Sequence, residues 1–555
     1  TFAKTKCAPV KHIGVSCCYN HVKSKPCFDN IQLIRKNVER GLTTADFEGT
    51  TSETTHFKEH FDEFGNQITD TVYNANIAAT RYGLFEYDSD GNNLISHTDD
   101  RGNKLNYTVD EETSLVTSVE NRCHQKVDYE YDDAKRLKRI SNKDALNNTI
   151  ATVIYDYDTF DDITRITRGD GMEYSFEYNK FRQPMSIAFG KNTEAILTYE
   201  YNDNGKLKQI NFANGEKLII IYNNLGQVIS ETVQSGESTT IAKRKYIYDN
   251  SGNIVRTIDL INKKEYTYTY SEENLLRVVE YNIEIDNNDL VVSRMVANVY
   301  IYAYDEKNRL TNRSLVSNGE KVSRVSYDYV NDTKIMSYST DTGVAVNTIA
   351  NFDELGRVSS DAINTETSNI QRDFTYVAGS IPQEYSDLGK VKSAATTNLV
   401  KEITITGVGS NRTLSYEYDA EERITKVTDS KGFVSEYTYD AMGQLFTETV
   451  NGEVVNNMTY DNYGNILIKN GVQYEYDNVW KDKLVKYGNF VNNYDVLGNP
   501  TSYLGHTLDW EKGKLKSFDN NTYTYNLNGI RTDKTVSGVK HTYLLDGTKI
   551  VKEVW

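Results

Sequence analysis

One short unit, Tyr-Asp-x-x-Gly-Asn, recurs along almost the whole chain and constrains its fold more than any other feature. Residues 460–465 form a complete copy, and looser copies lie between the complete ones at intervals of roughly 16–34 residues. The predicted turn positions of the clearest copies are the pairs Asp62 and Gly65, Asp88 and Gly91, Asp249 and Gly252, Asp353 and Gly356, Asp440 and Gly443, Asp461 and Gly464, and Asp495 and Gly498.

Each residue type in the unit favours one part of a β-hairpin. The residues before it alternate in polarity, as in 436–439, and are rich in aromatic and β-branched types, which is typical of a strand. Asp at the first turn position can accept hydrogen bonds from the backbone two residues on, and Gly at the fourth can adopt positive φ. A single copy would be an ordinary hairpin turn, whereas many copies indicate a repeat architecture.

The repeated unit resembles that of the YD-repeat, or Rhs-repeat, proteins, which include Rhs toxins, shell subunits of Tc toxin complexes, bacterial wall-associated proteins and teneurins. The resemblance covers residues 57–555, and the runs 523–531 and 543–549 are similar to the late part of such repeat regions. It implies an all-β fold in which consecutive hairpins pair edge to edge in a long antiparallel sheet. Such a sheet must twist and curl into a spiral wall, and we expect an incomplete shell.

The sequence predicts three regions. In residues 1–40, the run 27–35 resembles the closing strand of a carbohydrate-binding β-sandwich, so this region is expected to be the end of such a domain. Residues 41–56 are polar, Thr-rich and aperiodic, which is typical of a linker. Residues 57–555 are the predicted repeat shell. Longer hairpin loops or insertions are expected around 283–292 and 377–399.

Composition supports an extended sheet and excludes two classes of partner. The chain has 42 Tyr against 18 Phe and only 5 Pro, which suits long sheets that need every backbone donor. The formal net charge of −17 disfavours nucleic-acid binding. The longest aliphatic run, 218–221, is too short for a membrane span. The chain begins at Thr1 without Met, so we interpret it as a piece of a longer polypeptide.

Three motifs suggest a ligand but are better explained by turns and strands. His56 and His60 match a zinc-binding spacing for a helix, but on a strand they would lie about 13 Å apart. The tripeptide 168–170, Arg-Gly-Asp, has the composition of a hairpin tip. Residues 88–92 lack the full calcium-loop pattern. We therefore expect no metal and no cofactor.

Cysteines and histidines are both concentrated near the ends of the chain. Four of the five cysteines, Cys7, Cys17, Cys18 and Cys27, lie near the N-terminus, and Cys123 lies in the repeats. Their spacing matches no zinc-binding pattern, so we interpret them as free thiols in a fragment of a longer chain. A disulfide or metal knot at the N-terminus is the alternative. The histidines are His12, His21, His56, His60, His97, His124, His506 and His541, so a Ser-His or Cys-His pair within 125–505 is excluded.

These observations predict a protein that is not an enzyme and has no catalytic residue. The Asp-Pro segment with which toxin relatives cut off their C-terminal toxin is missing, so self-cleavage does not carry over to this chain. The resemblance implies a scaffold from a secreted or surface-located bacterial protein, with a downstream segment of the same polypeptide, such as a toxin, as its cargo. The alternative is a module that binds carbohydrates or cell surfaces, because exposed Tyr rings and Asn or Asp side chains suit glycans.

Overall fold

The computed structural model describes residues 39–41, 44–45, 51–52, 55–74, 80–190, 194–236, 239–330, 333–340, 345–353, 355–365, 367–380, 395–407, 409, 411–526 and 528–555. Over 39–60, 70–82 and 328–345 it describes the backbone alone. The predicted β-sandwich end lies almost wholly outside these residues, and so do Cys7, Cys17, Cys18 and Cys27.

Every regular element among the described residues is a β-strand, which confirms the predicted all-β class. The first part of the wall contains β4 (Thr55–Phe61), β5 (Gln67–Asn74), β6 (Thr80–Tyr87), β7 (Leu94–Thr98), β8 (Lys104–Val109), β9 (Val116–Glu120), β10 (Lys126–Tyr131), β11 (Leu137–Lys143), β12 (Thr149–Tyr157), β13 (Ile163–Arg168), β14 (Glu173–Tyr178), β15 (Pro184–Phe189), β16 (Ala195–Tyr201), β17 (Leu207–Phe212), β18 (Lys217–Tyr222), β19 (Val228–Ser235) and β20 (Thr239–Tyr248).

The strands of the middle part are longer. They are β21 (Ile254–Asp259), β22 (Lys264–Tyr270), β23 (Leu275–Ile285), β24 (Val291–Tyr304), β25 (Leu310–Ser317), β26 (Glu320–Val330), β27 (Thr333–Thr340), β28 (Ala345–Phe352), β29 (Val358–Asn364), β30 (Asn369–Ala378), β31 (Thr396–Gly407), β32 (Arg412–Tyr418), β33 (Ile424–Asp429), β34 (Val434–Tyr439), β35 (Leu445–Val450) and β36 (Glu453–Tyr460). β23 and β24 form the long hairpin expected around 283–292, whereas 381–394 lie outside the described residues.

The C-terminal strands are short. They are β37 (Ile466–Lys469), β38 (Val472–Tyr476), β39 (Leu484–Tyr487), β40 (Phe490–Val491), β41 (Asn493–Tyr494), β42 (Pro500–Tyr503), β43 (His506–Glu511), β44 (Lys514–Phe518), β45 (Asn521–Tyr525), β46 (Arg531–Val536), β47 (Val539–Asp546) and β48 (Lys549–Val554).

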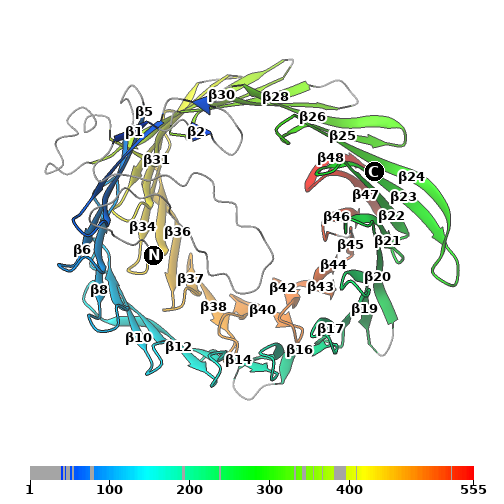
Figure 1. The fold of residues 1–555 in the computed structure, drawn as a ribbon, viewed down its shortest axis with the longest axis horizontal. Coiled ribbons are helices and arrows are strands. Elements are labelled where there is room, and N and C mark those ends of the chain that lie inside the picture. The colour runs from blue at the N-terminus through cyan, green and yellow to red at the C-terminus, as the bar shows by residue number, and fades with distance from the viewer. Residues whose placement is uncertain are drawn as a thin grey trace, which may run out of the picture.

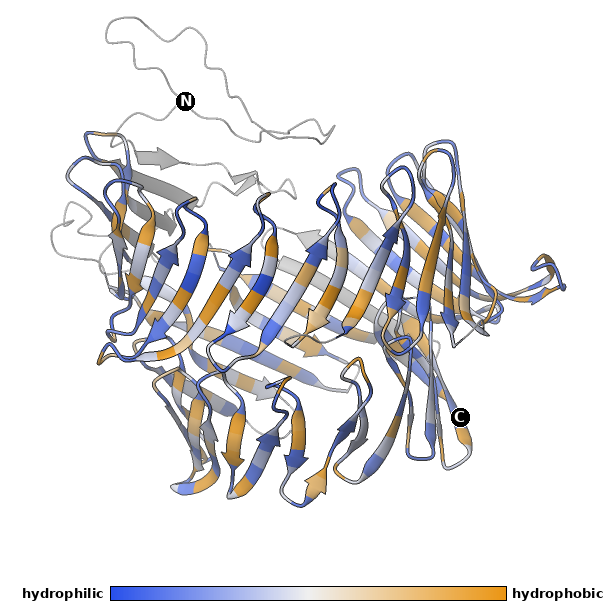
Figure 2. Cartoon of the chain, turned by 90° about the horizontal axis from the view of Figure 1, so that it is seen from below, coloured by the Kyte–Doolittle hydropathy of each residue, from blue (hydrophilic) through white to orange (hydrophobic). Residues whose placement is uncertain are grey.

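Each strand from β4 to β40 pairs antiparallel with the next, and so does each strand from β41 to β48, so the chain folds as a long meander with one break in pairing. β1 and β4–β40 form a 38-stranded sheet, and β41–β48 form an 8-stranded sheet that follows it. In Figure 1 the meander runs around a ring, with no described strand across the middle, and β31–β48 pass a second time along the path of β6–β26. Figure 2 shows the resulting two coils as two tiers of strands. This architecture confirms the long curled antiparallel sheet predicted from the repeats.

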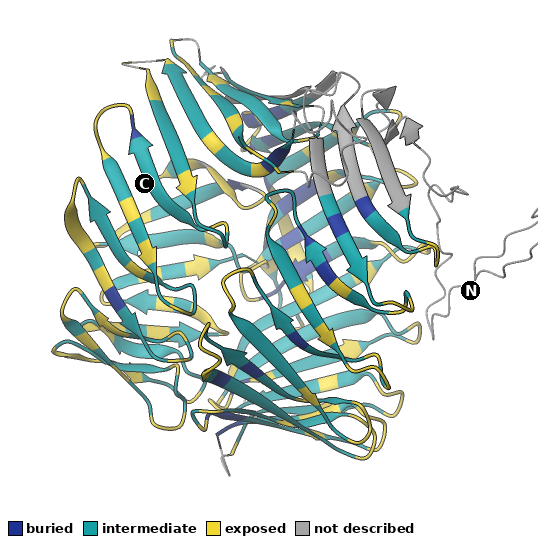
Figure 3. Ribbon diagram, turned by 90° about the vertical axis from the view of Figure 1, so that its left-hand side faces the viewer, coloured by how far each residue is buried: buried dark blue, intermediate teal, exposed yellow. Residues whose placement is uncertain are grey.

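The wall is a single sheet thick. Figure 3 shows strands that are mostly half-buried, with few buried positions, and Figure 2 shows apolar and polar residues alternating along them. A small apolar cluster, Ile258, Leu260 and Ile283, packs against Ile285 and Val291, the residues on either side of the β23–β24 turn. Nearby, the buried Glu265 accepts hydrogen bonds from Arg256 at 2.7 Å and Arg294 at 2.9 Å. Lateral packing between neighbouring strands therefore replaces the central core of a globule.

The start of the wall differs in detail from the predicted boundary between linker and repeats at residue 57. β4 begins at Thr55, and β1 (Glu39–Gly41) pairs with it, Arg40 opposite Phe57. β2 (Thr44–Ala45) and β3 (Thr51–Ser52) form a small pair within the predicted linker 41–56. The backbone of 56–60 is a strand, as expected from its position before the first repeat turn.

Candidate functional site: the Tyr-Asp edge and the seam between coils

The repeat turns gather along one border of the wall, which we call the Tyr-Asp edge. It contains the turns that begin at Asp62, Asp88, Asp132, Asp158, Asn179, Asn202, Asn223, Asp249, Asp305, Asp353, Asp419, Asp440, Asp461, Asp477, Asp495 and Asn526. A meander alternates its turns between two borders, so the turns after β8, β22 and β43 also lie on this border. The turns on the other border form what we call the opposite edge.

Each repeat turn is closed by the side-chain oxygen of its first residue, a carboxylate oxygen of Asp or an amide oxygen of Asn. At Asp461, Oδ1 accepts the Tyr463 N–H at 2.8 Å and the Asn465 N–H at 3.0 Å, while Oδ2 accepts the Asn465 side chain at 2.8 Å. The Gly464 N–H donates to the Asp461 carbonyl at 3.3 Å, and Gly464 has φ +91°. The pairing register shifts between Thr459 and Tyr460, which is the bulge that such a turn produces.

The structure places all the sequence-predicted turn residues in this geometry. The glycine N–H of each pair donates to the carbonyl of its aspartate, and each of these glycines has positive φ. In copies that lack glycine, the same position still has positive φ, as at Lys135 (64°), Arg182 (64°) and Glu422 (65°). The turn geometry is therefore maintained where the glycine is lost, at the cost of strained backbone.

The tyrosine before most of these turns connects neighbouring hairpins, a role that the sequence analysis missed. Tyr460, the last residue of β36, donates its hydroxyl to the carbonyl of Leu445, the first residue of β35, at 2.8 Å. The ladder between these strands begins only at Thr447 and Asn457, so it does not reach the Tyr-Asp edge. The hydroxyl thus bridges two hairpins where their backbones have separated.

The same tyrosine bond recurs along the wall. It is made by Tyr131, Tyr157, Tyr178, Tyr201, Tyr222, Tyr248, Tyr270, Tyr304, Tyr376, Tyr418, Tyr439, Tyr476, Tyr494 and Tyr525, and Trp510 makes its equivalent with the indole N–H. Burial, followed by the nearby charge of Asp461, raises the pKa of Tyr476 to about 12, so this hydroxyl stays a donor at neutral pH. The preference for Tyr over Phe, 42 against 18, was the sequence signal for this role.

The residue after the turn glycine reaches forward to the next repeat turn. Asn66 donates to the carbonyl of Gly91 at 2.6 Å, and Asn465 donates to the carbonyl of Lys481 at 3.2 Å. Where this residue is cationic, it also lies over the tyrosine of the following repeat, as Arg423 does over Tyr439 at 4.7 Å. Several pairs of successive turns are therefore joined side chain to backbone along this edge.

The Tyr-Asp edge of the second coil docks on the opposite edge of the first. Arg101 donates to the Asp419 carbonyl at 3.0 Å, and the Lys512 N–H donates to Glu216 at 3.1 Å. Gln125 donates to the carbonyl of Ala441. These contacts join residues 296 to 318 positions apart, which is the length of one coil. We call this line of contacts the seam.

Arg168 makes the strongest contact of the seam. It donates to both carboxylate oxygens of Asp482, at 2.7 and 2.9 Å, and its guanidinium lies 4.3 Å from the ring centre of Tyr463. It also pairs with Asp170 at 2.6 Å, and its side chain is 15% exposed. The Arg-Gly-Asp tripeptide is thus a hairpin tip whose charges are used within the chain. Beside it, Phe189 packs on Trp480 with ring centres 4.2 Å apart.

The remaining candidates form no metal-binding cluster in the part of the chain that the structure describes. No cluster of three or more His, Cys, Asp or Glu side chains suited to a metal occurs there. Asp88 is already engaged by Asn92 and Asn93 within its turn. Cys123 is a free, exposed thiol. The described residues also include no helix with the length and apolar character required to cross a bilayer.

Comparisons with known proteins agree with the repeat analysis. Residues 390–509 match the family model described as the teneurin YD-shell. The fold is similar to a TcdB2-TccC3-TEV crystal structure, with 13% identity, a TM-score of 0.48, and coverage of 88% of this chain and 31% of that one. A Tc holotoxin pore from Photorhabdus luminescens gives 12% identity, a TM-score of 0.37, and coverage of 92% and 29%.

This chain spans only about a third of the length of those structures, 31% and 29%. No curated protein matches it. The sequence resemblance is confirmed by the YD-shell match at residues 390–509, which falls within the repeat-bearing sheet. The Tyr-Asp turn also recurs along this sheet from β4 to the last strands, so the resemblance to YD-repeat, or Rhs-repeat, proteins extends beyond the matched residues.

Proposed function

We propose that this chain is a non-enzymatic wall segment of a shell, from a secreted or surface-located bacterial YD-repeat protein. Its role is to enclose or present a segment encoded downstream in the same polypeptide, such as a toxin or effector. The observation that carries the proposal is the long meander of strands that coils around a central region, with its two coils joined by the seam. A binding module needs only the exposed face of a few hairpins, whereas coils joined to each other by a seam suit enclosure.

The bonding pattern supports a structural rather than a catalytic role. The described histidines that make hydrogen bonds do so with carboxylates, as His124 does with Glu120 and His506 with Asp519, both at 2.8 Å. The polar side chains of the Tyr-Asp edge are used up by turn closure, hairpin bridging and seam contacts. Such saturation leaves few groups free for chemistry and makes the wall rigid.

Protection of an attached passenger tests this function. A flexible, protease-sensitive segment is joined after Trp555, and its cleavage rate is compared with that of the same segment on an unrelated folded carrier. Enclosure predicts slower cleavage on this chain. Equal rates on the two carriers would contradict it.

A seam variant sharpens the passenger experiment. Arg168→Gln removes the bidentate bond to Asp482 and should open the coils, so the passenger becomes more accessible. Arg165→Gln is the matched control, because Arg165 lies on the same strand and pairs with Asp156 within the first coil. If both variants protect the passenger equally, the seam does not close the wall.

A further inference from the structure

The β23–β24 hairpin extends past its neighbours as a bare two-stranded ribbon. The ladder between β23 and β22 ends at Asn282, and the ladder between β24 and β25 ends at Asn298. Beyond these points β23 and β24 pair only with each other among the described strands, as far as Ile285 opposite Val291. Figure 1 shows this hairpin leaving the ring on its outer side. One side of β24 therefore has no strand beside it.

The unpaired side of β24 presents backbone hydrogen-bonding groups. The Ile283 N–H donates to the Lys263 carbonyl at 3.0 Å, so the backbone of Ile283 bonds away from β24. Arg294 lies opposite Ile283, and the two residues of such a non-hydrogen-bonded pair direct their N–H and C=O groups away from each other. The backbone groups of Arg294 therefore point to the open side, and so, two residues on, do those of Val296. These groups can bond to one more strand.

This open edge lacks the devices that protect other strand edges. Residues 292–296 are all exposed, and Met295 is 65% exposed. The segment 290–297 contains no Pro, Lys, Asp or Glu, which are among the residues that keep an edge strand from pairing. The last strand, β48, pairs with β47 alone among the described strands, and it carries Lys549 and Lys552. The contrast indicates that another strand covers the edge of β24.

The side chains around the open edge favour an apolar partner. Arg294 is the only charged residue of the segment, and its guanidinium bonds to the buried Glu265 at 2.9 Å. Asp289, in the turn before β24, is held by Lys243 at 2.5 Å. With these charges neutralised, the exposed row is apolar and a charged partner would gain little from it.

A second copy of the chain matches this edge. It supplies an identical open strand and an identical apolar row, and a two-fold axis buries the same residues on both chains. Centred on Ser293, antiparallel pairing sets Leu290 opposite Val296 and Val291 opposite Met295. In this register neither arginine faces its own copy, so no like charges lie directly opposite each other.

We propose that β24 pairs with the same segment of a second copy across a two-fold axis, so that the protein forms a weak, reversible dimer. The dimer is weak because the paired segment is short and buries less area than a stable complex. Each copy has a net charge of −17, so salt should strengthen the dimer by screening their repulsion. The pairing goes beyond the proposed enclosure and does not depend on it, because the ribbon lies outside the ring.

Sedimentation equilibrium of the whole chain at about 1 to 200 μM, a range suited to a weak interface, tests the proposal. The mass should rise with concentration from 63.3 kDa towards twice that value and stop there, and high salt should shift the rise to lower concentration. A monomer at every concentration would overturn the proposal, whether or not the edge accepts another extended peptide. Growth beyond the dimer, or a dimer that salt weakens, would also overturn it.

Charged variants at the predicted centre locate the contact. Ser293→Lys sets a cation against its own copy and should leave the chain monomeric, and Ser293→Glu should do the same. An equimolar mixture of the two variants should recover the dimer. Ile301→Lys is the matched control, because Ile301 lies on the same strand and is 44% exposed but has a strand on each side.

Circular dichroism checks that the three variants fold. If folded Ser293→Lys dimerises as Ile301→Lys does, the contact lies elsewhere. If the mixture of the Lys and Glu variants stays monomeric, Ser293 does not lie at a two-fold axis. Either result would overturn the proposal.

Discussion

On the opposite edge of the wall, Asp99 and Asp144 close their turns with the same hydrogen bonds that Asp461 makes on the Tyr-Asp edge. Asp99 Oδ1 accepts the N–H groups of Arg101 and Asn103 at 2.9 and 2.8 Å, and Asp144 binds the equivalent groups of its own turn. The tyrosine bonds between hairpins, by contrast, all lie on the Tyr-Asp edge among the described residues. Aspartate therefore shapes the turn on either edge, whereas tyrosine joins hairpins into a wall.

The difference explains why the two edges meet at the seam. An edge held by tyrosine bridges and forward-reaching side chains has a fixed spacing of turns, so it can dock on a partner as one rigid row. The opposite edge offers single groups such as Arg101, Arg168 and Glu216 to that row. The Tyr-Asp edge holds neighbouring hairpins together, and the opposite edge supplies the groups on which that edge docks.

Acidification should have the largest effect, because it acts on the turns of both edges at once. Hydrogen bonds lower the pKa of Asp88, chiefly from the Asn92 N–H, and of Asp144, chiefly from the Asn148 side chain. A pKa lowered in the folded state means that the stability is present above the unfolded value, about 3.9, and is lost as pH falls through the folded pKa. Melting temperature followed by circular dichroism should be steady near neutral pH and fall below about pH 4. An unchanged melting temperature down to about pH 2 would contradict the role of the carboxylates.

Asp461→Ala should have the largest effect of a single substitution. It removes the acceptor of three hydrogen bonds and should lower local stability by about 2–3 kcal/mol. Native-state hydrogen exchange of amides in β36 and β37 measures this, since repeat arrays open locally. Asn462→Ala in the same turn is the control and should change little. If protection from exchange is also lost well outside β36 and β37, the turn is not an independent unit.

Gly464→Val should cost about 1 kcal/mol or more, because a β-branched residue resists positive φ. Asn462→Val should cost less. Gly432 on the opposite edge has the same φ of +91° with nothing within 4 Å of an added Cβ, whereas Gln444 lies 3.2 Å from that position at Gly464. Similar costs for Gly464→Val and Gly432→Val would show that backbone conformation governs both edges. Equal effects at Gly464 and Asn462 would refute the turn assignment.

Tyr460→Phe should have the smallest effect, about 1 kcal/mol, because only the hydroxyl's bond to the Leu445 carbonyl and its weak contact with Met458 Sδ are lost. Tyr437→Phe is the matched control, since in the described part of the chain that hydroxyl has no hydrogen-bond partner. The exchange of β35 amides near the Tyr-Asp edge should rise in the first variant and not in the second. Equal exchange of these amides in both variants would show that the Tyr460 hydroxyl does not bridge the two hairpins.

The hairpin and its curl were predictable because their signals are local. Asp461, Gly464 and the alternating strands around them specify strand, turn and strand within a few residues. The role of Tyr460 was not predicted. The abundance of tyrosine in the chain was explained by strand propensity, which does not distinguish Tyr from Phe. The choice of Tyr was nonetheless present in the sequence, with Phe61 and Phe352 as exceptions.

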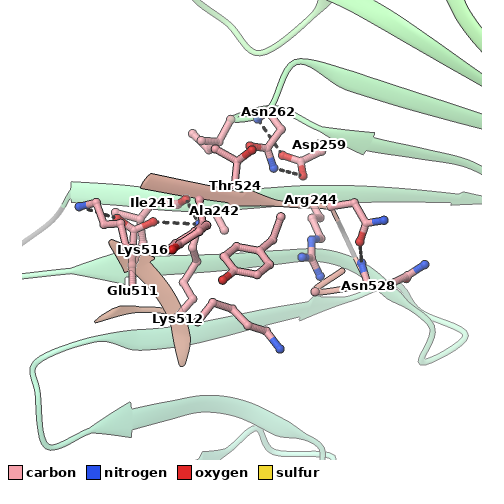
Figure 4. A pocket seen from close by; sticks show the side chains of 16 residues that line it. Ile241, Ala242, Arg244, Asp259, Asn262, Glu511, Lys512, Lys516, Thr524 and Asn528 are labelled. Carbon is pink, nitrogen blue, oxygen red and sulfur yellow. Dashed lines mark hydrogen bonds and ion pairs between the residues drawn. The ribbon is translucent and has the colours of Figure 1, made fainter. Parts of the chain in front are cut away.

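The seam was not predictable from the repeats. Arg168 meets Asp482 only because the accumulated twist and strand count bring residues 314 positions apart together. A cavity of about 380 Å³ between the coils (Figure 4) depends on the same docking, since its lining residues Arg244 and Lys514 belong to different coils. A local pattern specifies the wall, and the number of strands in each coil decides which residues become neighbours.

Small-angle scattering tests the central claim that one sheet coils around a central space. A solid globule of this length has a radius of gyration near about 24 Å. A coiled wall places its mass away from the centre, so we expect about 27 Å or more for the monomer, with the distance distribution shifted to long vectors. A monomer at the compact value, with no central deficit in its distance distribution, would mean that the hairpins pack face to face and would contradict the coiled wall.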